Sequence, residues 1–220
     1  MLVIGIDDAG RGPLIGPMIL AGVLLDKNGQ EVLKKYGIKD SKQVIHSSRI
    51  KMAKIIKETA LAYKIVKTSA KDIDKSLLSG TNLNKLEAMK AGEIINSLNN
   101  GRQKIKVVVD CPSNNILAWK NMMMDFVENK SNLIITCEHK ADVNHIDVAA
   151  ASILAKVTRE EEVTKLKKQY PDMGSGYPSD PDTKKFLKTK GKQLTNSGIF
   201  RKTWQTWKKM FPEKNQSTLF

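Results

Sequence analysis

The sequence predicts an α/β fold that contains a mixed sheet and ends in a helical extension. Three observations indicate this class: the chain starts with two apolar runs, strand and helix patterns alternate through its middle, and only helical patterns follow. Such a succession is typical of a sheet that combines an antiparallel pair with parallel crossover units. We expect a core at 1–170, an extension at 171–212 and a flexible tail at 213–220.

The strands are predicted from apolar runs and from alternating polarity. The first two runs lie at 2–7 and 17–26, and the short loop between them favours antiparallel pairing. Lys, Asn and Gly at 27–29 indicate a turn directly after the second run. Three further strands are expected at 62–69, 105–110 and 133–137.

The helices are predicted where apolar residues recur with helical spacing. These segments lie at 47–60, 82–98, 114–127, 148–168 and 199–210. Another helix is expected to begin at Asp180 and Pro181, because Asp is a favoured N-cap residue and Pro a favoured residue of the first turn.

The charge of the chain indicates a polyanionic partner. Its 220 residues carry a formal net charge of +14. Nucleic acid is the partner that this excess favours first. Binding to a membrane surface is less favoured, because the basic residues are spread along the chain and do not gather in one amphipathic helix. Excess lysine that merely raises solubility is the alternative that composition leaves open.

The chain shows no targeting or membrane signal. No apolar stretch approaches the roughly 20 residues that span a bilayer, and the first residues lack the pattern of a secretion signal. We therefore expect a cytoplasmic protein that does not enter membranes, and a monomer. Cys111 and Cys137 lack the spacing of metal ligands, so we expect free thiols.

Aspartates follow three of the predicted strands. Asp7 and Asp8 come at the end of the first apolar run, Asp110 ends the strand at 105–110, and Asp142 lies beyond 133–137. If these strands are parallel neighbours, the carboxylates meet at one edge of the sheet. Carboxylates that close repel one another, so a cluster is stable mainly around cations. Oxygen ligands without Cys or His favour Mg²⁺ or Mn²⁺.

Two such ions about 3.5–4 Å apart activate a water and stabilise the leaving oxygen of a phosphodiester. A basic protein with this cluster is therefore a candidate metal-dependent nuclease. Aspartates at strand ends also commonly serve as turn or cap residues, and their spacing alone leaves both interpretations open.

Longer motifs decide between these interpretations. The first is GIDDAGRGPLIGPM at 5–18. The others are KDSKQV at 39–44, NLNKLEAM at 82–89, VVVDCP at 107–112, EHKAD at 138–142, AAASILAKVTRE at 149–160, GSGYPSDPDT at 174–183 and FRKTWQTW at 200–207. Together and in this order they resemble ribonuclease HII, the type 2 ribonuclease H, and its archaeal branch in particular.

The resemblance implies a ribonuclease H-like fold, with a mixed five-stranded sheet flanked by helices and a C-terminal helical extension that contacts substrate. It implies an endonuclease that hydrolyses RNA in RNA–DNA hybrids and cuts 5′ of ribonucleotides embedded in duplex DNA, leaving 3′-hydroxyl and 5′-phosphate ends. The four metal-binding carboxylates of the family correspond to Asp7, Asp8, Asp110 and Asp142, which would hold two Mg²⁺ or Mn²⁺ ions.

Two acidic positions depart from the family pattern. The family has Glu where this chain has Asp8, and the shorter side chain would set its oxygens back by about 1 Å, which matters for the strict geometry of Mg²⁺. Asp147 stands where the family more often has an uncharged residue, and it competes with Asp142 for the fourth carboxylate role. We favour Asp142 because of its motif, and we expect Asp147 to cap the following helix.

The resemblance also assigns substrate contacts. The segment Gly10, Arg11 and Gly12 would sense the ribose 2′-hydroxyl, which separates RNA from DNA. Both glycines permit a positive φ and a close approach of the backbone. Tyr177 would pack against the sugar of the nucleotide after the ribonucleotide, and Lys42 would contact a phosphate.

Neighbouring side chains of a strand point to opposite faces. We therefore expect the backbone to leave extended geometry at Asp7 and Asp8 if both are to reach one site.

A protein of the same fold that binds hybrids or duplexes without cutting them, or cuts them only weakly, is the alternative function. The intact carboxylate set argues against it, because a pure binder gains nothing from buried negative charge that faces phosphates. Near the C-terminal end, Gln216, Leu219 and Phe220 resemble the start of a sliding-clamp-binding peptide, although its usual final aromatic is absent. A disordered tail is the other interpretation of these residues.

Overall fold

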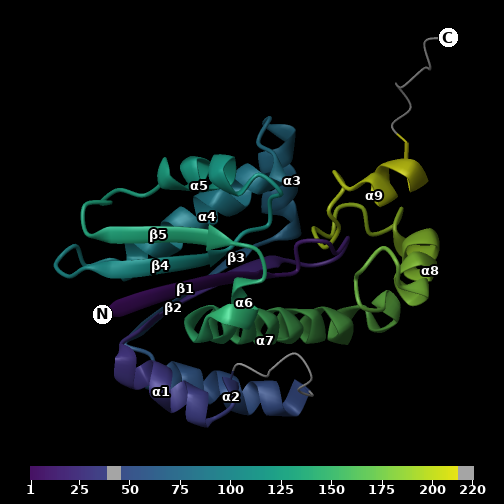
Figure 1. Ribbon diagram of the computed structural model, residues 1–220. Coiled ribbons are helices and arrows are strands. Elements are labelled where there is room, and N and C mark those ends of the chain that lie inside the picture. The colour runs from purple at the N-terminus through teal and green to yellow at the C-terminus, as the bar shows by residue number, and fades with distance from the viewer. Residues whose placement is uncertain (39–45, 213–220) are drawn as a thin grey trace.

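The protein is known from a computed structural model that describes residues 1–38 and 46–212. Its centre is a five-stranded sheet with the strand order β3-β2-β1-β4-β5 (Figure 1). The strands are β1 (Leu2–Ala9), β2 (Met18–Leu25), β3 (Ala62–Thr68), β4 (Ile105–Asp110) and β5 (Leu133–Glu138). β1 pairs antiparallel with β2 and parallel with β4, so the predicted mixed sheet is confirmed.

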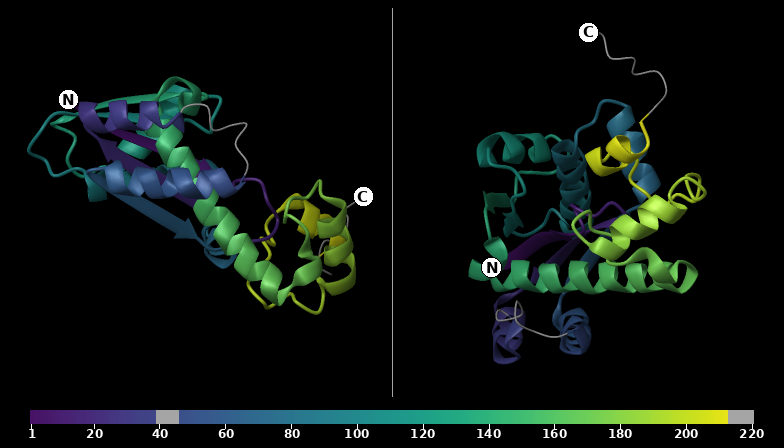
Figure 2. Two further views of the ribbon diagram at one scale, coloured as in Figure 1. Left: turned by 90° about the horizontal axis from the view of Figure 1, so that it is seen from below. Right: turned by 90° about the vertical axis from the view of Figure 1, so that its right-hand side faces the viewer.

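Helices cover both faces of this sheet (Figures 1 and 2). In the described ranges they are α1 (Lys27–Lys35), α2 (His46–Thr59), α3 (Ala70–Leu78), α4 (Leu83–Leu98), α5 (Ile116–Met124), α6 (Ala141–Asn144), α7 (Ile146–Gln169), α8 (Pro181–Lys190) and α9 (Gln205–Met210). A short 3₁₀ helix, η2 (Pro171–Met173), follows α7. No helix among these residues is long and apolar enough to cross a bilayer.

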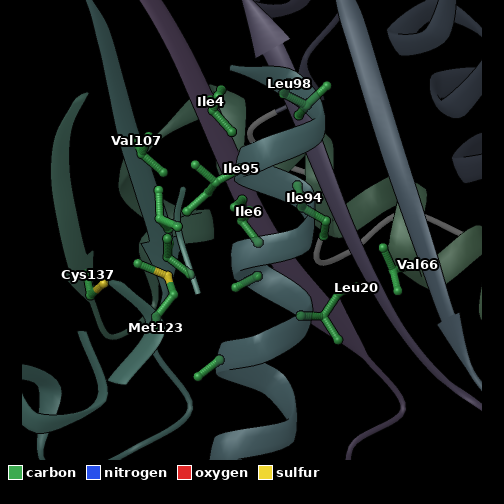
Figure 3. Close-up of a cluster of buried hydrophobic side chains, with 14 of the residues drawn as sticks. Ile4, Ile6, Leu20, Val66, Ile94, Ile95, Leu98, Val107, Met123 and Cys137 are labelled. Atoms are coloured by element: carbon green, nitrogen blue, oxygen red, sulfur yellow. The ribbon is translucent and has the colours of Figure 1, made fainter. Parts of the chain in front are cut away.

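The first part of the core lies between the sheet and α4. Ile4 and Ile6 of β1, Val107 of β4 and Ile94 and Ile95 of α4 are buried together there (Figure 3). They meet because alternate residues of a strand face the same side, whereas the apolar residues of α4 recur with helical spacing. Burial of such side chains away from water is the main favourable term in folding.

The second part of the core lies between the sheet and α7, and α1 and α2 pack beside that helix. Three consecutive alanines, Ala149–Ala151, let α7 approach the strands closely. Gly5 of β1 is required at this contact, because a Cβ there would lie 2.2 Å from the carbonyl carbon of Asp147. The central strands are therefore buried on both faces, which positions the ends of β1 and β4 rigidly.

A third apolar cluster belongs to the C-terminal extension. Phe186, Phe200 and Trp207 pack there with Leu14 and Ile15, which come from the loop between β1 and β2. The extension is thus joined to the loop that follows the first acidic residues. The division into a core at 1–170 and an extension at 171–212 stays a prediction.

Many predicted elements are confirmed. The strand at 105–110 has the predicted bounds, and Asn82 caps α4, which was expected at 82–98. Asp180 caps α8, and Pro181 occupies its first turn. The cap side chain of Asp180 accepts a hydrogen bond from the Asp182 N–H at 3.0 Å.

Other predictions were wrong. Residues 27–29 begin α1 and do not form a turn, because the Asp26 carboxylate accepts a hydrogen bond from the Gly29 N–H at 2.7 Å and so caps a helix. The predicted helix at 199–210 begins only at Gln205, because Phe200 forms a β-bridge with Ile15. The sequence analysis also missed α3, which Ser69 caps.

Asp147 does not cap α7. The N-cap residue is His145, and Asp147 lies inside the first turn with only 3% of its surface exposed. Its Oδ2 atom is buried without a hydrogen-bond partner among the described residues. Burial raises the pKa of this carboxyl above its usual value.

Candidate active site

The predicted carboxylates lie at or just beyond the carboxyl ends of the neighbouring strands β1, β4 and β5. In the pairing of β1 with β4, Ile6 lies opposite Val109, so Asp7 and Asp110 follow side by side. Asp142 lies in α6, directly after β5, which is parallel to β4. The three strands are parallel neighbours, as expected, and Asp7, Asp8 and Asp110 line one small cavity at their ends. Asp142 is not among the described walls of that cavity, so its place in the cluster stays a prediction.

The loop from β5 to α6 is tied to the end of β4. The Ala141 N–H donates to Oδ1 of Asp110 at 3.0 Å, and the Cys111 N–H donates to the Glu138 carbonyl at 2.9 Å. A ring nitrogen of His139, Nδ1, lies 3.0 Å from the Cys111 carbonyl oxygen. Lys140 has a φ of 57°, in the left-handed region, and it is the N-cap residue of α6, which carries Asp142.

The backbone does not leave extended geometry at Asp7 and Asp8, contrary to expectation. Pairing with β2 continues without a break through Asp7, Asp8 and Ala9, and the chain turns only in the loop between Ala9 and Met18. Asp7 therefore faces α7, like Gly5, whereas Asp8 faces α4, like Ile6. Asp7 and Asp8 nevertheless line one small cavity together with Asp110. The cavity lies at the end of the strands, so residues from either face of the sheet can reach it.

Burial and mutual repulsion outweigh the groups of the protein that favour the charged carboxylates of this site. Burial raises the pKa of Asp7 to about 8, and the charges of Asp8 and Asp110 add to the rise. Burial also raises the pKa of Asp8 to about 6, although the charge of Arg11 opposes it. Such shifts follow from desolvation and from like charges at short range.

The chemistry of these side chains fits a hard divalent cation, because every donor is a carboxylate oxygen. As the side chains stand, no three His, Cys, Asp or Glu residues within 1–38 and 46–212 are arranged to hold one ion. A cation bound between Asp7, Asp8 and Asp110 would remove the repulsion that raises their pKa values.

Arg11 is held by α4. Its Nη2 donates to Oδ1 of Asn84 at 2.7 Å, and its Nη1 forms an ion pair with Glu87, whose side chain is almost fully buried. Glu87 also lines the cavity of the carboxylates. Arg11 thus fixes the glycine loop, defined as residues 10–16, to the helix beside the acidic cluster.

The C-terminal extension holds the same loop from the other side. Arg201 is completely buried, and its guanidinium donates to the carbonyl oxygens of Gly10, Arg11 and Gly16 at 2.6, 2.8 and 3.0 Å. Nε1 of Trp204 donates to the Gly12 carbonyl at 3.1 Å. The conformation of the loop is therefore set by residues nearly two hundred positions away.

The two glycines have different roles. Gly10 has a φ of +84°, and a Cβ there would lie 2.3 Å from Cδ and Nε of Arg159, so only glycine fits. Gly12 does not adopt a positive φ, which corrects the expectation for that residue. A Cβ on Gly12 would meet only the ring of Tyr177, at 3.9 Å.

Tyr177 lies beside the glycine loop with 42% of its surface exposed. The guanidinium of Arg159 sits over its ring, 5.3 Å from the centroid, in cation–π geometry. The structure thus brings Gly10, Arg11, Gly12 and Tyr177 together beside the acidic cluster. Lys42 lies outside the described residues.

Sequence reasoning missed three charged residues of this site: Glu87, Arg159 and Arg201. Each lies within a family-like motif, which is the only signal that the sequence offers for them. Charged residues are almost never fully buried unless they are paired. From the sequence alone, these three side chains would therefore be expected at the surface, although the structure buries them.

A sheet in this order, with acidic residues at the ends of β1 and β4 and just after β5, defines a nuclease with a ribonuclease H-like fold. The family model described as Ribonuclease HII matches residues 4–207. The chain belongs to the ribonuclease HII family, and it is a ribonuclease H enzyme. Enzymes of this family are metal-dependent.

Known proteins match the chain over nearly its full length. A relative named Ribonuclease HII, from Pyrococcus furiosus, is 43% identical over 213 residues, which are 96% of this chain and 91% of the relative. The crystal structure of ribonuclease H2 from Pyrococcus horikoshii OT3 has a TM-score of 0.86 and 37% identity, covering 96% of this chain and 97% of that one. The structure of the PCNA:RNase HII complex from Archaeoglobus fulgidus has a TM-score of 0.81 and 32% identity, and the match covers 93% of this chain and 96% of that one.

The buried carboxylates predict how stability depends on pH without metal. Because the pKa of Asp7 rises from 3.8 unfolded to about 8 folded, the folded state binds more protons, and stability falls as pH rises between these values. Asp7→Asn should therefore be more stable than the native chain at pH 8 in chelator, by on the order of 2 kcal/mol, and the difference should shrink towards pH 4. Urea unfolding at several pH values measures it.

The exposed Asp172→Asn is the matched control and should keep the pH slope of the native chain. Equal slopes for the native chain and Asp7→Asn would contradict the uncompensated charge of Asp7.

Proposed function

We propose that this enzyme hydrolyses the RNA strand of RNA–DNA hybrids and cuts duplex DNA on the 5′ side of embedded ribonucleotides, leaving 3′-hydroxyl and 5′-phosphate ends. The observation that carries the proposal is the position of the acidic cluster. Asp7, Asp8 and Asp110 line one cavity, and Arg11 and Tyr177 lie beside it on the glycine loop and the extension.

Asp7, Asp8, Asp110 and Asp142 are proposed to hold two Mg²⁺ or Mn²⁺ ions. Two such ions, when bound, activate a water and stabilise the leaving oxygen of a phosphodiester. The chain itself contributes carboxylates held together in a small buried cavity, where a bound cation would relieve the repulsion between their charged forms. Ala141 orients Asp110 through the hydrogen bond from its N–H.

The glycine loop and Tyr177 are proposed to read the sugar. Gly10, Arg11 and Gly12 would sense the ribose 2′-hydroxyl, and the Tyr177 ring would pack on the sugar of the next nucleotide. Arg201 and Trp204 hold the carbonyls of the loop in place, and Arg159 holds the ring, so the two parts are preorganised relative to each other. Preorganisation improves recognition by reducing the cost of ordering on binding. Lys42 and the extension at 171–212 would add backbone contacts.

The decisive assay uses duplex DNA with one embedded ribonucleotide, with Mg²⁺, Mn²⁺ or chelator. The native chain should cut 5′ of the ribonucleotide only when metal is present, and Asp110→Asn should lose roughly 100-fold or more in rate, because one of the proposed metal ligands becomes neutral. Asp172→Asn is the matched control and should cut normally. Cleavage that persists in Asp110→Asn would refute the metal-dependent site.

Asp8 is proposed to change the metal preference. It replaces the family glutamate with a side chain that is one methylene shorter, and Mn²⁺ tolerates the longer reach better than Mg²⁺ does. The ratio of Mn²⁺-supported to Mg²⁺-supported cleavage should therefore fall several-fold in Asp8→Glu, as measured by initial rates. Identical ratios for the native chain and Asp8→Glu would contradict this role.

A sliding clamp is the proposed protein partner. The structural neighbour from Archaeoglobus fulgidus is a PCNA complex, and Gln216, Leu219 and Phe220 resemble the start of a clamp-binding peptide, although they lie outside the described residues. A monomeric state and a cytoplasmic location are proposed alongside this partner.

The clamp proposal predicts that the full chain binds purified archaeal clamp in a titration, whereas a chain ending at Lys214 does not. The shortened chain should cut free duplexes at the native rate, because the removed residues are not placed in the active site. Equal clamp affinity of both chains would exclude the tail as the binding segment.

A further inference from the structure

A second concave surface lies outside the acidic cluster. A cavity of about 850 Å³ opens between α3 and the C-terminal segment 195–212. None of the carboxylates Asp7, Asp8 and Asp110 belongs to its described walls. Figure 1 shows α3 and α9 beyond the carboxyl ends of β4 and β5, so the cavity lies at the same end of the sheet as the acidic cluster.

The rim of this cavity is strongly basic. Four lysines line it: Lys71, Lys75, Lys202 and Lys208. None of them forms an ion pair with a residue in the described ranges. Four ammonium groups on one concave wall repel one another, so the arrangement favours an anionic occupant.

The one acidic residue in the described walls, Asp74, is already engaged. Its carboxylate accepts hydrogen bonds from the Lys202 N–H at 2.7 Å, from the Thr203 N–H at 3.0 Å and from the Thr203 hydroxyl at 2.6 Å. Asp74 is buried and fastens the extension to α3. It therefore shapes the wall of the cavity and leaves the exposed lysines as its charged surface.

The floor of the cavity is apolar. Phe200, Trp207 and Phe211 form it, and Thr195 and Asn196 add polar groups at its edge. A sugar–phosphate backbone presents both kinds of surface, since its phosphates are anionic and its deoxyribose faces are largely apolar. A single inorganic anion would leave most of a cavity of this size unfilled.

The cavity is continuous with the glycine loop. Phe200 lines it and forms a β-bridge with Ile15 of that loop. The next residue, Arg201, binds the carbonyls of Gly10, Arg11 and Gly16. The wall of the cavity and the glycine loop are therefore joined through the same short C-terminal segment.

We propose that the cavity between α3 and the C-terminal segment binds the sugar–phosphate backbone of the substrate duplex at a second position, away from the carboxylates. This inference rests on the proposed function, because the occupant is the flank of the same substrate. The cavity anchors nucleotides distant from the cut, and it makes affinity depend on duplex length.

The test compares binding of two duplexes of about 12 and about 24 base pairs, each with one central ribonucleotide, to protein made inactive by Asp110→Asn. Lys71, Lys75, Lys202 and Lys208 are changed together to Gln. The variant should bind the longer duplex about tenfold or more weakly. The slope of log affinity against log salt should become shallower by up to about 3.6, because each of the four lost phosphate contacts removes about 0.9. Binding of the shorter duplex should change much less.

The matched control changes Lys27, Lys34, Lys35 and Lys51 to Gln. It removes the same charge from α1 and α2, which lie beside α7 and far from α3 (Figure 1). Its effect on both duplexes should be small. A second variant with Arg at the four cavity positions keeps the charge and should bind the longer duplex like the native chain.

Equal losses in the cavity variant and the control, or a cavity variant with unchanged length dependence, would overturn the proposal. The proposal would also be overturned if the Arg variant bound the longer duplex as weakly as the Gln variant does. Cleavage of the shorter duplex by protein with its native carboxylates tests the proposed function separately, because that duplex need not reach the cavity.

Discussion

One buried guanidinium holds the glycine loop in its conformation. Arg201 is fully buried and donates three hydrogen bonds to carbonyl oxygens of the glycine loop. Loss of such a donor leaves buried carbonyls unsatisfied, at a cost of about 1–3 kcal/mol for each group. The loop that would read the sugar therefore depends on a residue near the C-terminal end, and Asp74 of α3 fastens the backbone just after that residue.

The acidic cluster lowers the stability of the folded protein when its carboxylates are charged. Asp7 is nearly buried and stands close to Asp8 and Asp110, so its charged form is disfavoured without a cation. A rigid sheet covered on both faces holds these groups in place despite their repulsion. Such conflict between local energy and global structure is expected at functional sites. A cation bound at the proposed metal site would relieve it.

Much of the fold could be predicted because its signals are local. The strand at 105–110 is a run of β-branched residues, and α4 and α8 begin at side chains that cap them. α1 was missed because Lys, Asn and Gly at 27–29 are typical turn residues. In the structure the Asp26 side chain caps these residues, and they form the first turn of the helix. The helix expected at 199–210 begins only at Gln205, because Phe200 forms a β-bridge with Ile15. Ile15 is distant in the sequence, so no local pattern predicts this bridge.

The sequence by itself marked Asp7, Asp8 and Asp110 as candidates for one site, because each stands at a predicted strand end and within a motif. Only the tertiary structure decided how they are oriented: Asp7 and Asp8 face opposite sides of an unbroken strand and still line one cavity. It also decided which cations are buried around the glycine loop, Arg159 and Arg201. The reason is physical, since burial of a charge depends on partners distant in the chain, whereas strand and cap signals act between neighbours.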